Sequence, residues 1–163
     1  MHASPAEAAE AFRARRVAVL ACLTSAYVEL RGYAPAPWPH PFALAKGETV
    51  RLRGDHQLGL TVAEEYELTE VAGGDWEAQI VSYFYSFEHA GSELLAYHWH
   101  PQGHSRVTGP HLHVLGEREF DGQPLGKLHL PTGAIRLEEI VALAIAELGA
   151  EPLREDWQRV LGA

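Results

Sequence analysis

Apolar residues recur at helical spacing through the first thirty positions of the chain. Ser4 is a typical helix N-cap, Pro5 suits the first helical position, and Glu7 can complete a capping box. The apolar positions fall on one stripe, which comprises Phe12, Val17, Leu20, Leu23, Tyr27 and Leu30. The pattern predicts a helix over residues 4–31 that stops at Gly32.

A proline-rich segment separates this helix from a region of strand-like alternation. Residues 34–41 contain four prolines, which remove backbone donors and fix φ, so we expect an ordered connector rather than a helix or central strand. From about residue 48 the pattern predicts strands over residues 49–53, 62–71, 76–87, 93–100, 111–120 and 126–130. In the third of these strands, the residues expected on one face are Val81, Tyr83, Tyr85 and Phe87.

The C-terminal part returns to helical spacing. Residues 136–149 form a strongly amphipathic pattern that ends at Gly149, and residues 153–161 predict a last short helix. The element order predicts a single α+β domain over residues 1–163. Its antiparallel sheet should have about five to six strands, preceded by a long N-terminal helix and followed by one or two C-terminal helices.

Composition narrows the classes of function. A net charge of −9 argues against a protein that coats nucleic acid, although it does not exclude a nuclease with a local basic patch. Cys22 is the only cysteine, which excludes an intrachain disulfide and a thiolate metal cage. We find neither an apolar run of membrane-spanning length nor an export signal, so we expect a cytoplasmic protein with no membrane association.

Ten histidines are the unusual feature of the composition, and five of them fall within residues 98–113. His98 and His100 are two residues apart, as are His111 and His113, so each pair projects from one face of a strand. A short loop between the pairs can bring both strands side by side, and the four imidazoles then converge. His104 in the loop and His129 further along are candidates to join them.

One interpretation of this cluster is a transition-metal site. His98, His100, His111 and His113 are then the ligands, and zinc is the most natural metal for neutral imidazole. The carboxylates nearest in sequence are Glu93 and Glu117.

The other interpretation is metal-free acid–base catalysis by the same four histidines. One imidazole removes the ribose 2′-hydroxyl proton of a phosphodiester, and another protonates the leaving oxygen. A cation must stabilise the extra negative charge of the transition state. Arg106 is the candidate catalytic cation, and Arg118, Lys127 and Arg136 are also near enough in sequence to serve.

A partial resemblance to a known family bears on this choice. The segments YFYSF at residues 83–87, GSELLAY at 91–97 and PHLH at 110–113 resemble the sheet portion of TumE-type bacterial toxins. The resemblance covers about residues 80–113, and it departs where Ala96, Tyr97 and His98 replace the family's Arg-Tyr-Asp. It implies a toxin that acts on RNA and is paired with an antitoxin.

Three functions therefore remain open. The first is a toxin or defence-type endoribonuclease that needs no metal. The second is a zinc-binding protein or metal-dependent hydrolase. The third is a non-catalytic interaction module whose N-terminal helix binds a partner protein.

Overall fold

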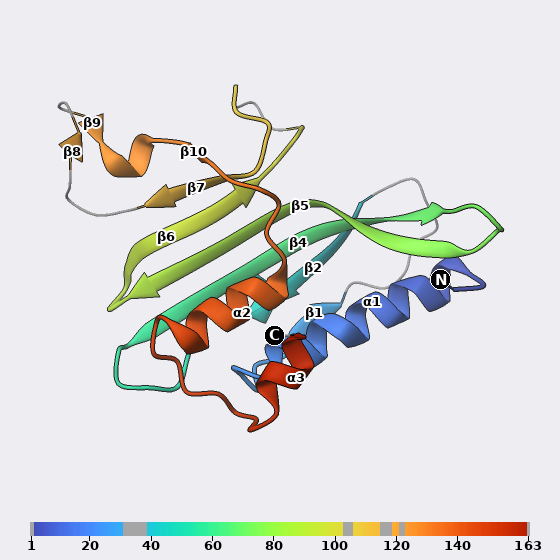
Figure 1. The fold of residues 1–163 in the computed structure, drawn as a ribbon, viewed down its shortest axis with the longest axis horizontal. Coiled ribbons are helices and arrows are strands. Elements are labelled where there is room, and N and C mark those ends of the chain that lie inside the picture. The colour runs from blue at the N-terminus through green and yellow to red at the C-terminus, as the bar shows by residue number, and fades with distance from the viewer. Residues whose placement is uncertain (1, 31–38, 103–105, 115–118, 121–122, 163) are drawn as a thin grey trace.

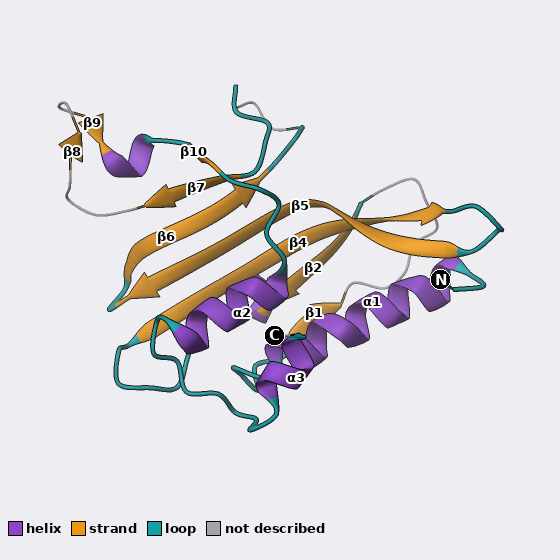
Figure 2. Cartoon of the chain, in the orientation of Figure 1, coloured by secondary structure: helices purple, strands orange, loops and turns teal. Residues whose placement is uncertain are grey.

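In the computed structural model, α-helices pack against one face of an antiparallel sheet (Figures 1 and 2). The structure describes residues 2–30, 39–102, 106–114, 119–120 and 123–162. Within these ranges the helices are α1 (Pro5–Leu20), α2 (Leu137–Ala146) and α3 (Trp157–Leu161), with 3-10 turns η1 (Ala45–Gly47) and η2 (Leu125–Lys127). The α+β fold expected from the sequence is confirmed.

The sheet runs in the order β1-β2-β4-β5-β6-β7-β10, and every described pairing is antiparallel. Its first strands are β1 (Val28–Leu30), β2 (His40–Leu44), β3 (Val50–Arg51), β4 (Leu58–Glu70) and β5 (Trp76–His89). They are followed by β6 (Ser92–Trp99), β7 (His111–Val114) and β10 (Leu130–Pro131). β3 pairs with β4 beside this path, and β8 (Glu119–Phe120) forms a separate two-stranded unit with β9 (Gln123–Pro124).

Helix α1 begins as predicted but ends eleven residues before residue 31. Ser4 Oγ accepts a hydrogen bond from the Glu7 amide, while the Glu7 carboxylate accepts one from the Ala3 amide. After Leu20 the chain turns, Thr24 Oγ1 accepts a hydrogen bond from the Ala26 amide, and the chain enters β1. The predicted end was wrong because threonine, serine, tyrosine and valine follow, which favour local side-chain caps and extended backbone over helix.

The proline-rich connector also extends less far than expected, because β2 starts at His40 inside it. Pro41 pairs with Glu65 of β4, and the β1 partners of β2 begin only at Phe42. The missing N–H of Pro41 therefore interrupts no described β1–β2 hydrogen bond. Residues 34–38 of the predicted connector lie outside the described part of the chain.

A β-bulge in the long β4–β5 hairpin changes which side chains face the core. Glu65 pairs with Ser82 but Tyr66 pairs with Ile80, which leaves Val81 as the extra residue. Ile80 therefore packs against the core, and the prediction that Val81 shares the face of Tyr83 was wrong. Strict alternation cannot reveal an inserted residue of this kind.

The last predicted strands are shorter than expected. β7 covers only the start of the predicted strand 111–120, and residues 115–118 lie outside the described chain. Most of the predicted strand 126–130 is the turn η2 and a loop, with pairing only at β10. Pro124 and Pro131 flank this segment and lack the N–H groups that a longer ladder needs. Helices α2 and α3 lie inside the predicted ranges.

Large apolar side chains fill the space between the helices and the sheet. The largest buried ones are Tyr83, Tyr85, Phe42, Phe87, Leu20, Leu23, Leu44, Leu60, Leu137 and Ile140. A buried ion pair crosses this layer, since Arg16 of α1 contacts Glu64 of β4 at 2.9 Å. Among the described residues no helix has the length and apolar character needed to span a membrane. The cytoplasmic location stays a prediction.

The opposite face of the sheet carries small side chains and histidines. Because side chains alternate along a strand, the residues between the core aromatics point away from the helices. The pairing places them in cross-strand rows, one of which is Ala63, Phe84, His98 and His111. A neighbouring row is Thr61, Ser86, Ala96 and His113. The fold thus collects the histidines on the face without α-helices.

Candidate metal centre

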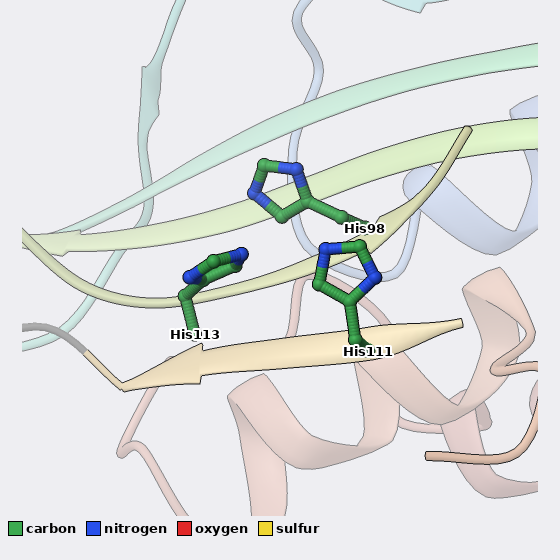
Figure 3. A group of neighbouring side chains, drawn as sticks. All are labelled: His98, His111 and His113. Carbon is green, nitrogen blue, oxygen red and sulfur yellow. The ribbon is translucent and has the colours of Figure 1, made fainter. Parts of the chain in front are cut away.

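Three histidines from two neighbouring strands surround a common space (Figure 3). His98 of β6 pairs with His111 of β7, and the centroids of their rings are 5.5 Å apart. His113, two residues further along β7, lies 4.9 Å from His98 and 5.1 Å from His111 between centroids. The convergence follows from the His-x-His spacing together with the β6–β7 register, and it includes three of the four imidazoles that the sequence placed together.

The ring nitrogens are close enough to share one metal ion. One nitrogen from each of these three residues lies within 4.8 Å of the others. Two nitrogens bound to one tetrahedral zinc, at about 2.0–2.1 Å from the metal, are roughly 3.3 Å apart. Rotations of the imidazole rings by about 1 Å at their tips therefore suffice to close the site around an ion.

Backbone carbonyls fix the orientation of two of the rings. His111 Nδ1 lies 2.9 Å from the Gly109 carbonyl oxygen, and His113 Nδ1 lies 3.0 Å from the Gly126 carbonyl oxygen. A carbonyl only accepts hydrogen bonds, so Nδ1 carries the proton in a neutral ring and Nε2 keeps its free lone pair. Metal-binding histidines in proteins are commonly oriented in this way.

The surroundings of His98 and His129 favour the neutral imidazole, which is the form that binds metals. Burial, and after it the neighbouring His113, His111, His100 and His129, lower the pKa of His98 to about 4. Partial desolvation also lowers the pKa of His129, followed by the effects of His113 and His111. At neutral pH a metal ion therefore displaces no proton from His98.

The remaining predicted residues lie at different distances from this trio. His129 belongs to the cluster, because its ring centroid is 4.8 Å from that of His111 and 4.6 Å from that of His113. The ring of His100 is exposed and lies 5.9 Å from that of His98. Arg106 is exposed, and within the described chain it has no hydrogen bond or ion pair with these histidines. His104 lies outside the described residues.

Two further features of the site could not be predicted from the sequence. One is the pair of carbonyls, of Gly109 and Gly126, because a backbone acceptor has no residue-type signal. The other is a cleft on the same face, whose lining includes Glu65 and Ser82. The bulged β4–β5 register pairs Glu65 with Ser82, and the β5–β6 register brings this pair beside His100.

No protein-family model matches this chain, and the comparisons with curated proteins and with solved structures found no match. The resemblance to TumE-type toxins stays a prediction from the sequence.

Proposed function

We propose that this protein binds one transition-metal ion, most readily zinc, and uses it to hydrolyse an organic substrate. The observation that carries the proposal is the convergence of His98, His111 and His113, with their nitrogens within 4.8 Å of one another. The ligand set contains only imidazole nitrogen, which suits zinc, copper, nickel and iron, and zinc is the commonest of these with histidine.

Three protein ligands leave a coordination position open, which is the arrangement of catalytic rather than structural zinc sites. Zinc in such a site lowers the pKa of a bound water to about 7. A metal held by His98, His111 and His113 would supply an activated water as the nucleophile for hydrolysis. The chain's own contribution is to hold the three rings, two of them through the Gly109 and Gly126 carbonyls.

The surroundings of the cluster favour this proposal over metal-free catalysis. Cleavage of RNA by two histidines needs a cation beside the reacting phosphate. The charged groups that shift the pKa of His98 are other histidines, and those that shift the pKa of His129 are His111 and His113. None of these groups is an arginine or a lysine that could serve as that cation. Ribonuclease activity and an antitoxin partner remain predictions, and RNA cleavage by EDTA-treated protein would support them over a metal-dependent hydrolase.

Calorimetric titration of zinc into EDTA-treated protein tests the proposal. We expect one zinc ion per chain, with a dissociation constant of about 1 µM or tighter. His111→Ala or His113→Ala should weaken binding at least about 100-fold, because each change removes a ligand and leaves two. The matched control is His89→Ala, since His89 is an exposed histidine at the far end of β5.

The proposal fails if the titration shows no saturable zinc binding, or if His89→Ala weakens binding as much as His111→Ala does. In the second case the histidine-rich chain collects zinc without a defined site. Circular dichroism of each variant checks that the sheet has formed before the affinities are compared.

A further inference from the structure

A cleft lies beside the candidate metal centre, on the same face of the sheet. Its main part has a volume of about 510 Å³, and its lining includes Glu65, Glu67, Ser82 and His100. A second hollow of about 260 Å³ adjoins it, because both share Glu65, Ser82 and His100. The two hollows together form a groove across β2, β4, β5 and the end of β6.

The strand register connects this groove with the histidines. Glu65 pairs with Ser82, and continuing the β5–β6 register by one residue places His100 beside Ser82. Strands are about 4.8 Å apart, so Glu65 lies roughly 10 Å from His100 along this row. Phe84 lines the second hollow, and its ring centroid is 4.8 Å from that of His98. The groove therefore ends beside His98, at the edge of the group formed by His98, His111 and His113.

The lining combines apolar walls with negative charge. The second hollow has small or apolar side chains from Pro41, Ala43, Ala63 and Phe84. Glu65 and Glu67 bring carboxylates to the main cleft, and no lysine or arginine is among the described residues that line either hollow. Ser82 donates a hydrogen bond to Glu65 Oε2 at 2.7 Å, and no hydrogen bond in the described structure involves Glu65 Oε1.

We propose that this cleft holds the substrate of the metal centre and selects molecules with an apolar body and a positively charged amine. The proposal rests on the metal-dependent function proposed above. The apolar part lies on the small side chains of the floor, and the ammonium group pairs with Glu65 and Glu67. A scissile group at the other end of the apolar body, beside Phe84, then reaches His98. The negative rim repels anions, in keeping with the net charge of −9.

Two probes of equal shape and opposite charge test the selection, namely 4-phenylbutylamine and 4-phenylbutyrate. In amide-resolved NMR titrations of the zinc-loaded protein, we expect the amine to shift the signals of Glu65, Ser82 and His100, and the carboxylate to leave them unchanged. The double variant Glu65→Gln with Glu67→Gln should weaken amine binding at least about 5-fold. Glu70→Gln, an exposed change on the same strand, is the control and should have no effect.

Equal binding of both probes, or no shift at the cleft with the amine, overturns the proposal. The same titration after EDTA treatment separates it from the proposed function. Amine binding that persists without metal supports the cleft as a cation-selective site even where zinc fails to bind. Zinc binding with no amine binding supports the metal centre and rejects this substrate class.

Discussion

Zinc should raise the melting temperature of EDTA-treated protein by roughly 8–16 °C when its free concentration is about a thousand times the dissociation constant. A ligand that binds only the folded state at this excess adds about 4 kcal/mol to the free energy of unfolding. For a domain of this size each kcal/mol corresponds to about 2–4 °C. The metal has this effect because its ligands come from β6 and β7, which separate on unfolding. Differential scanning fluorimetry measures the shift.

The histidine variants give this prediction its control. His113→Ala should lose most of the zinc-dependent rise, whereas His89→Ala should keep all of it. A rise of the same size in His113→Ala would mean that zinc stabilises the protein from somewhere else. A small rise in every variant, including the unaltered protein, would contradict the proposed site.

Arg16→Met should destabilise the protein by about 3–5 kcal/mol, which makes it the most damaging single change we expect outside the core aromatics. The Glu64 side chain is 0% exposed and contacts Arg16 Nε at 2.9 Å. Burial raises the pKa of Glu64, and Arg16 opposes this effect because its charge stabilises the carboxylate. Without Arg16, Glu64 must either stay buried as a carboxylate that has lost its ion-pair partner or take up a proton, and both outcomes cost free energy of folding. Urea denaturation followed by circular dichroism measures the loss.

Two further variants show whether the buried charge is the cause. Arg16→Met combined with Glu64→Gln should recover most of the lost stability, because glutamine is neutral and can still accept the hydrogen bond that Tyr85 donates to this side chain. Arg13→Met on the same helix should cost less than about 0.5 kcal/mol, since no described ion pair involves Arg13. If the double variant is no more stable than Arg16→Met alone, lost packing of the arginine explains the result.

Local patterns predicted the fold well where one element depends on its own residues. Ser4 and Pro5 marked the start of α1, and Gly149 marked the region where α2 ends, with a φ of +77° that glycine adopts at little cost. The prediction failed where the outcome depends on partners distant in sequence. The stripe that includes Tyr27 suggested a longer helix, but the helix ends at Leu20 and the chain goes on to form β1, which pairs with β2. The choice between continuing the helix and pairing with β2 depends on residues distant in sequence, so the local pattern cannot predict it.

The candidate site likewise has residues that local spacing predicted and residues whose place depends on distant parts of the chain. The spacing of His98, His111 and His113 predicted their common face, because alternation along a strand fixes the direction of each side chain. The relative importance of His100 and His129 could not be predicted, since it depends on where β6 ends and on the path of the chain from η2 into β10. The place of Glu65 in the cleft could not be predicted either, because it depends on the bulged register of the β4–β5 hairpin.

The X-ray absorption spectrum of the zinc-loaded protein reports which atoms are bound to the metal, and so it decides whether the histidines are the ligands. We expect a first shell of nitrogen and oxygen at about 2.0–2.1 Å, with outer-shell scattering from at least three imidazole rings. The variant His98→Ala should lose one ring from this pattern. A spectrum with a single imidazole, or with oxygen ligands alone, would show that the three histidines do not bind the metal together.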